Sequence, residues 1–375
     1  MFDDIRPYRD DEVNHVLHKL INEKELQESI AQFSLPFLKK YLPAVANFIV
    51  KLSLTSRVKN IHCINDIQAE VAKYLDKIIK TSTSGFTYSG LENFDHTKPC
   101  LFISNHRDIV LDAALVNYAL HKNNIDTVEA AVGDNLLHKE WVADLMRINK
   151  SFIVKRSEKT KRAMLTASKQ LSSYIHHSLT EKKQNIWIAQ KEGRAKDGID
   201  KTNAALISML LLNKNKETSI ADYLCELNII PVSISYEFDP CDHDKAKELA
   251  QRQATGSYQK HENEDLKSIT QGILGQKGKV HVSFCQPIQG EFEDSKAIAL
   301  AIDNQIIQHY KLYKSNLSAY EQLNNSNNSN NSNNTTNLND ALSERVQQLT
   351  QEQKHWLLTM YANPVFSKKS LEQVL

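Results

Sequence analysis

The fold class of this chain follows from one stretch, Leu101-Phe102-Ile103-Ser104-Asn105-His106-Arg107-Asp108-Ile109-Val110-Leu111-Asp112. It begins as a short apolar strand, ends that strand in Asn105-His106, and continues with two carboxylates. Catalytic and binding groups of α/β proteins usually follow the carboxyl ends of strands. Because a carboxylate can orient a neighbouring histidine and raise its basicity, the stretch contains the residues of a general-base pair.

Two carboxylates compete as the partner of His106. Asp108 and Asp112 are four positions apart, so they lie on nearly one face of the helix that Leu111 to Leu120 indicates. Either one can face His106, depending on the conformation of the loop. A second interpretation gives the stretch no chemistry, because Asp108 can cap the helix while His106 is an ordinary polar loop residue.

Strands and helices alternate on both sides of this stretch. We expect strands near 84–91, 100–104, 127–132, 151–155, 184–189, 228–236 and 278–284, and helices over 109–122, 139–147, 161–178 and 203–212. This alternation predicts an α/β sheet covered by helices. Gly272, Gly275 and Gly278 are interpreted as turn residues before the last strand.

The two ends of the chain differ from this middle part. Helices near Asp10 to Gln32, Phe37 to Leu54 and Asn65 to Lys80 predict a helical N-terminal region over 1–84. Residues 324–337 are almost entirely Asn, Ser and Thr, which predicts a disordered linker over 323–339. The remaining segment, 340–375, is expected to be a helical tail that docks on the core or binds a partner. We expect a chain cut at Leu323 to fold without it.

Composition excludes several classes of protein. The chain has 375 residues, 41% of them hydrophobic, which is enough for a sizeable core, and its net charge of +1 argues against nucleic-acid binding. Five scattered cysteines without a Cys-x-x-Cys fit reduced thiols in the cytoplasm. The run Cys241-Asp242-His243-Asp244 is expected to be a solvated turn rather than a metal site.

Motifs of other enzyme classes are missing from the sequence. His106-Arg107-Asp108 resembles the start of a protein-kinase catalytic loop, but Ala113 stands where that loop needs Asn. The chain contains no Gly-x-Ser-x-Gly, His-Glu-x-x-His or P-loop pattern. Serine hydrolase, zincin and P-loop functions are therefore not expected.

The sequence contains no run of about 18 apolar residues and its N-terminus is acidic, so we expect neither a membrane span nor a signal peptide. The segment from Phe33 to Leu54 mixes bulky apolar residues with lysines. Two interpretations remain open for it: a helix lying in a membrane interface, or a helical pair packed on the core.

Four blocks in order resemble the glycerolipid acyltransferase family, which comprises glycerol-phosphate and lysophosphatidate acyltransferases. They are Asn105 to Asp112, the strand Ser151 to Arg156, the strand Ile186 to Arg194 with its Glu-Gly-Arg ending, and the strand Ile229 to Tyr236. The resemblance covers about residues 85–290. The sequence departs from the family pattern in the first block: His106 and Asp112 are six steps apart instead of five, and Leu111 stands where the aspartate is expected.

The resemblance implies a mixed sheet with covering helices in an acyltransferase domain over 85–315. It implies transfer of a fatty acyl group from acyl-CoA or acyl carrier protein to a hydroxyl of glycerol-3-phosphate or lysophosphatidate, in phospholipid synthesis at the inner face of the cell membrane, without cofactor or metal. His106 would be the general base, and Asp112 or Asp108 would orient it. The substrate-binding residues by analogy are Asn105, Lys155, Arg156, Glu192, Gly193 and Arg194.

Two other functions stay open at this point. The displaced aspartate favours a membrane-surface or scaffold protein that keeps the fold and has lost the chemistry. Retention of His106 together with Glu192, Gly193 and Arg194 argues against that loss. A hydrolase or transacylase could also use the same histidine and aspartate.

Overall fold

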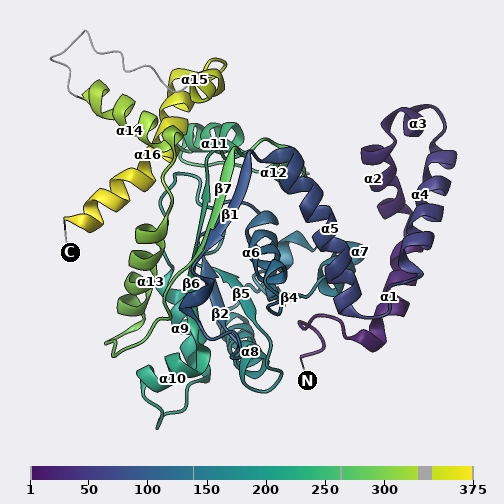
Figure 1. Ribbon diagram of the computed structural model, residues 1–375, viewed down its shortest axis with the longest axis horizontal. Coiled ribbons are helices and arrows are strands. Elements are labelled where there is room, and N and C mark those ends of the chain that lie inside the picture. The colour runs from purple at the N-terminus through teal and green to yellow at the C-terminus, as the bar shows by residue number, and fades with distance from the viewer. Residues whose placement is uncertain (1, 138, 262–263, 328–339, 374–375) are drawn as a thin grey trace. The chain divides into compact units, whose positions relative to one another are not determined.

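The structure, a computed structural model, describes residues 2–137, 139–261, 264–327 and 340–373 (Figure 1). The chain forms two compact units, which we describe separately. One contains Met1–Tyr74 and Val128–Tyr174, and the other contains Leu75–Thr127 and Ile175–Leu375. These boundaries differ from the expected domain boundaries at 84, 315 and 339. The expected division into a helical region, an acyltransferase domain, a linker and a tail stays a prediction.

The second unit is built on a mixed sheet, as predicted. Its strands lie in the order β1 (Gly85–Ser89), β7 (Lys279–Phe284), β6 (Ile229–Tyr236), β2 (Leu101–Ser104) and β5 (Ile186–Ala189). β6 and β7 are antiparallel, whereas β1 with β7, β6 with β2, and β2 with β5 are parallel pairs. The fold class is therefore α/β with a mixed sheet.

The strand quoted first, β2, lies in the interior of this sheet. Leu101 pairs with Ile186 on one side and with Ile229 on the other, and every residue of β2 is buried. This double burial explains why the strand is a continuous apolar run instead of an alternating one. Because β2 and β5 are parallel, the residues that follow their carboxyl ends lie at the same edge of the sheet.

Helices cover both sides of the sheet. α13 (Ser295–His309) packs on β6, and α6 (Leu111–Lys122) contacts β7 (Figure 1). α13 begins at Asp294, whose carboxylate accepts hydrogen bonds from two backbone N–H groups of its first turn. α9 (Ala204–Leu210) and α10 (Ile220–Leu227) follow β5 in the chain.

The first unit is mainly helical. It contains α1 (Asp10–Asn22), α2 (Lys24–Ser34), α3 (Pro36–Tyr41), α4 (Pro43–Val58), the first part of α5 (Ile64–Ser82), α7 (Glu140–Ile148), most of α8 (Lys161–Thr180), and the parallel strands β3 (Glu129–Gly133) and β4 (Ser151–Val154). The helical N-terminal region is thus as predicted. The single helix expected from Asp10 to Gln32 is wrong, because Glu23 adopts an extended backbone and caps α2.

The C-terminal segment belongs to the core of the second unit. α16 (Gln351–Glu372) packs against α14 (Lys314–Asn327) and α11 (Asp242–Thr255), and buries Leu357 and Ala362 completely. A cut at Leu323 would remove one side of this core, so we no longer expect such a chain to fold normally. Residues 323–327 were expected to be linker but continue α14; the rest of that linker, 328–339, lies outside the described residues.

Two local predictions are wrong for reasons of packing. Gly272 does not lie in a turn but in α12 (Glu264–Leu274), where the absent side chain leaves room for the carboxylate of Asp108. Asp242 does not lie in a solvated turn, because it is buried in the first turn of α11 and pairs with Arg345. Within the described ranges, every helix is too short or too polar to cross a lipid bilayer.

Candidate active site

The ends of β2 and β5 bring two sequence blocks together in the second unit. The backbone N–H of Gln190 donates to the Ser104 carbonyl at 2.8 Å, and the N–H of Ala195 donates to the His106 carbonyl at 2.7 Å. The loop after β5, which carries the Glu-Gly-Arg sequence, is therefore held against the loop that carries His106. Their proximity follows from the parallel pairing of the two strands.

His106 and Asp112 form a hydrogen-bonded pair. His106 Nδ1 lies 2.9 Å from Asp112 Oδ2, and the histidine side chain is partly exposed whereas Asp112 is fully buried. An ionised carboxylate can only accept hydrogen bonds, so Nδ1 carries the proton and Nε2 presents a lone pair. The pair therefore has the arrangement that a general base requires.

Backbone donors show how the six-step spacing is accommodated. Asp112 Oδ2 also accepts the N–H groups of Arg107 at 2.6 Å and of Asp108 at 2.9 Å, so the loop wraps around this one oxygen. Asp112 Oδ1 accepts the hydroxyl of Tyr236 at 2.9 Å. The additional residue is taken up before α6 begins at Leu111, which leaves Asp112 in the first helical turn.

Asp108 has a different role in the same loop. Its Oδ1 accepts the N–H groups of Val110 at 3.0 Å and Leu111 at 2.8 Å, so it caps the start of α6. Burial, followed by the nearby charge of Asp112, raises the pKa of Asp108. The structure thus pairs Asp112 with His106 and gives Asp108 the capping role that the sequence had left open.

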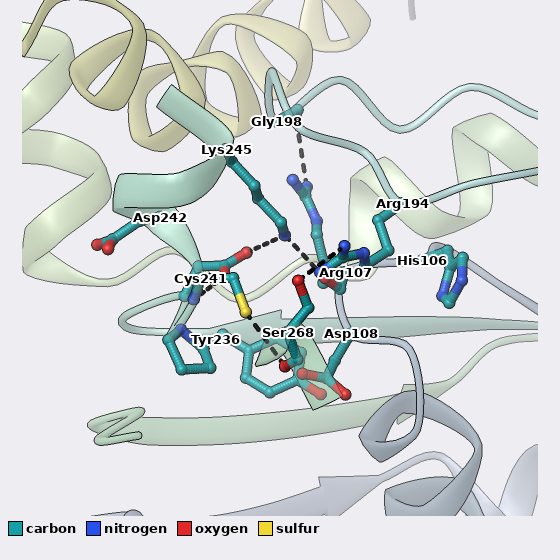
Figure 2. A network of polar contacts seen from close by, with 12 residues as sticks. His106, Arg107, Asp108, Arg194, Gly198, Tyr236, Cys241, Asp242, Lys245 and Ser268 are labelled. Carbon is teal, nitrogen blue, oxygen red and sulfur yellow. Dashed lines mark hydrogen bonds and ion pairs between the residues drawn. The ribbon is translucent and has the colours of Figure 1, made fainter. Parts of the chain in front are cut away.

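Arg107 connects this loop with the loop after β5. Its guanidinium donates to Asp200 Oδ2 at 2.6 Å. It also donates to the Gly198 carbonyl at 3.2 Å (Figure 2). Asp200 is buried, which raises its pKa, and the charge of Arg107 opposes that increase. Sequence reasoning missed Arg107 and Asp200, and only the position of Arg107 beside His106 could have signalled a role.

Asn105 is used by the fold. Its side chain donates to Asp200 Oδ2 at 3.2 Å and to the Ile234 carbonyl at 3.0 Å, and it accepts the Ile234 N–H at 2.8 Å. The residue is completely buried. Its amide connects the end of β2 to β6, because an amide can satisfy a backbone donor and acceptor at once. The expected contact of Asn105 with substrate stays a prediction.

Glu192, Gly193 and Arg194 lie where the loop after β5 meets the His106 loop. Gly193 adopts a φ of +74°, a backbone conformation that favours glycine. Glu192 and Gly193 are exposed, and Arg194 is half-buried with its guanidinium 3.4 Å from the Ser268 hydroxyl (Figure 2). Arg194 immediately precedes the residue that is hydrogen-bonded to His106, so the structure brings these predicted residues to one place.

Lys155 and Arg156 lie in the first unit, after β4. The Lys155 ammonium is 2.5 Å from Asp4 Oδ2 and 3.2 Å from Gln170 Oε1. The backbone N–H of Arg156 donates to Asp134 Oδ1 at 3.0 Å, and its side chain is exposed. A cavity of about 330 Å³ in this unit is lined by Lys155 and by residues from Glu158 to Gln170.

The carboxylate, imidazole and thiol groups of the described ranges form no group of three or more that could hold a metal ion. The chemistry that the site itself offers is proton transfer at His106 Nε2, with an oriented and buried carboxylate behind it.

Comparisons with known proteins give one family match and one structural match. Residues 85–235 match the acyltransferase family. The structure is similar to that of the 1-acyl-sn-glycerophosphate acyltransferase PlsC from Thermotoga maritima, at 11% sequence identity and a TM-score of 0.39, over 76% of this chain and 95% of that chain. A search of curated proteins found no match.

Proposed function

This chain contains, over residues 85–235, a domain of the acyltransferase family, and we propose that it acylates glycerolipid precursors. The proposed reaction transfers a fatty acyl group from acyl-CoA or acyl carrier protein to a hydroxyl of glycerol-3-phosphate or lysophosphatidate, in phospholipid synthesis. The observation that carries this proposal is the 2.9 Å contact between His106 Nδ1 and Asp112 Oδ2.

The first half of the reaction is proton removal. His106 Nε2 takes the proton of the acceptor hydroxyl while its oxygen attacks the thioester carbonyl carbon. The ring becomes imidazolium, whose Nδ1–H remains bonded to Asp112. The positive charge that develops beside this buried carboxylate is thereby stabilised.

In the second half, the tetrahedral intermediate collapses and breaks the carbon–sulfur bond. The departing thiolate takes the proton from His106 Nε2, which restores the neutral ring, and the new ester leaves. No covalent acyl-enzyme forms. Tyr236 supports Asp112 throughout, because burial raises the pKa of this phenol and keeps its hydroxyl a donor to Asp112 Oδ1.

Cationic residues are proposed to bind the acceptor phosphate. A guanidinium such as that of Arg194 offers paired donors to phosphate oxygens, and its position next to the His106 contact would place the acceptor near the base. Glu192 and Gly193 would shape the pocket around it. Lys155 and Arg156 stay predicted phosphate ligands by family analogy.

The N-terminal helices support the proposal that the protein attaches to the inner face of the membrane from the cytoplasm. On α3 and α4, Phe37 is 76% exposed and Phe48 is 61% exposed. Further exposed apolar side chains on these helices are Tyr41, Val45, Ile49 and Leu52, and Leu42 between the two helices is also exposed. An apolar surface with lysines nearby is the composition of an interfacial helix, whereas packing on the core would have buried these side chains.

A competing function, a scaffold without activity, rested on the displaced aspartate. The structure removes that support, because Asp112 contacts His106 despite the different spacing. The deciding experiment gives purified protein acyl-CoA or acyl carrier protein thioesters with a panel of glycerol-phosphate acceptors, and identifies the lipid products by mass spectrometry. A new acyl ester supports the proposal. Free fatty acid alone would indicate a hydrolase, and no turnover with any pair would favour the scaffold.

A further inference from the structure

The C-terminal helix α16 is connected to the His106 loop by two chains of polar contacts in the second unit. The first begins at Tyr361, whose hydroxyl donates to Asp242 Oδ2 at 2.8 Å and accepts the Asp239 N–H at 2.9 Å. The Asp239 carboxylate pairs with the ammonium of Lys245. Lys245 in turn donates to the Arg107 carbonyl at 2.7 Å (Figure 2).

The second chain runs through the loop after β5. Asn363 donates its side-chain N–H to the Asp197 carbonyl at 2.7 Å. The next residue, Gly198, has a φ of +80°, and a Cβ built there would lie 2.0 Å from the Met360 carbonyl oxygen. The carbonyl of Gly198 accepts the Arg107 guanidinium at 3.2 Å.

A proline explains why this part of α16 can approach another backbone so closely. Pro364 lies inside the helix and has no N–H, so the carbonyl four residues earlier, at Met360, receives no helical hydrogen bond from it. That is the carbonyl against which Gly198 packs. The neighbouring Tyr361 carbonyl is bonded to the Asn316 side chain at 2.9 Å, which fixes α16 on α14.

Both chains end on Arg107, one at its carbonyl and the other at its guanidinium. Arg107 follows His106 directly, and its own N–H donates to Asp112 Oδ2. We propose that α16 positions the general base, with Tyr361 and Asn363 as positioning residues that act through Arg107 on the His106–Asp112 pair. The expected fall in kcat rests on the proposed acyl transfer. The expected change at the His106–Asp112 pair rests on geometry alone.

The test compares Tyr361→Phe and Asn363→Ala with Tyr320→Phe in the full-length protein. Tyr320 lies on α14 in the same helical cluster, and its hydroxyl accepts the Lys369 ammonium at 3.0 Å. This control therefore loses a hydroxyl that contacts α16 but belongs to neither chain of polar contacts. We expect kcat to fall about 10- to 100-fold for the two test variants, with KM within about twofold of wild type, because a displaced base affects the transition state more than substrate binding. The control should keep its kcat within about twofold.

A spectroscopic measurement separates positioning from stability. The Nδ1–H proton of His106, bonded to Asp112, should give a downfield NMR resonance, and the two test variants should shift or broaden it while Tyr320→Phe does not. Wild-type kcat and an unchanged resonance, together with a lower melting temperature, would overturn the proposal. If Tyr361→Phe fails to fold, the kcat and the resonance of Asn363→Ala still test the proposal, because Asn363 is only half-buried. The resonance needs no turnover, so failure of the acyl-transfer assay would leave this test intact.

Discussion

Asp112 Oδ2 lies 2.9 Å from His106 Nδ1, and the same oxygen accepts the backbone N–H groups of Arg107 and Asp108. One carboxylate oxygen thus organises the loop and orients the histidine together. The backbone donors also hold Asp112 in place. We therefore expect substitutions in the loop, as well as substitutions of the carboxylate, to displace His106.

Replacing Asp112 should be far more harmful than replacing Asp108. We expect Asp112→Asn to lower kcat by about 10²- to 10⁴-fold, because the amide offers Nδ1 a poorer acceptor and does not stabilise imidazolium. Asp108→Asn keeps an oxygen that can cap α6 and should lose less than about tenfold. Steady-state kinetics of both variants checks this. A larger loss for Asp108→Asn would reverse the two roles.

His106→Ala should abolish most acyl transfer and leave the fold intact. The expected loss is about 10²- to 10⁴-fold in kcat, and the far-UV circular dichroism spectrum should stay that of wild type. The exposed His62, in the first unit, provides a matched His→Ala control with unchanged turnover. Turnover close to wild type in a clean preparation of the His106 variant would contradict the mechanism.

Arg194→Lys should impair the acceptor more than the donor. Lysine keeps the charge and loses the two-pronged geometry that suits a phosphate group. We expect the acceptor KM to rise at least about tenfold while the donor KM stays within about twofold. Arg252→Lys is the control, because Arg252 pairs with Glu248 on α11. Equal increases in both KM values would contradict a role of Arg194 in binding only the acceptor.

Gly272→Ala should destabilise the protein although alanine is the better helix former. The new Cβ would lie 2.1 Å from Asp108 Oδ2, so the capping carboxylate must move. We expect a loss of about 1–3 kcal/mol in the free energy of unfolding. In an Asp108→Ala background the same substitution should cost much less, which a double-mutant cycle measures. Equal costs in both backgrounds would show that the contact is unimportant.

Asp303 should make stability depend on pH. Burial raises the pKa of this carboxyl to about 6, and its Oδ1 accepts the Thr202 N–H at 2.7 Å. A raised pKa in the folded state means that its contribution is fully present below the unfolded pKa and is lost as pH rises through about 6. Relative to wild type, Asp303→Asn should therefore gain up to about 3 kcal/mol in unfolding free energy between pH 4 and 7. Denaturant titrations across that range test this, and a difference independent of pH would refute it.

Local pattern predicted the sheet and the place of the site. β2 is a continuous apolar run because both neighbours in the sheet bury it, and Asn105-His106 follows its carboxyl end, where α/β folds place their functional groups. The apolar run and the polar residues that follow it lie within a few residues of each other, so the sequence alone was enough to predict both the strand and the position of the site. It also placed Arg194 at the end of a parallel neighbour of β2.

Tertiary contacts decided the rest. Asp108 and Asp112 lie on nearly one face of a helical wheel. Only the loop backbone, held by Arg107 and its partner Asp200, turns Asp112 towards His106. The roles of Gly272 and of α16 depend on partners more than one hundred residues away, Asp108 and Arg107. The pattern of residues within one segment does not predict such contacts. They form only when separate elements pack together and bury their polar groups against each other.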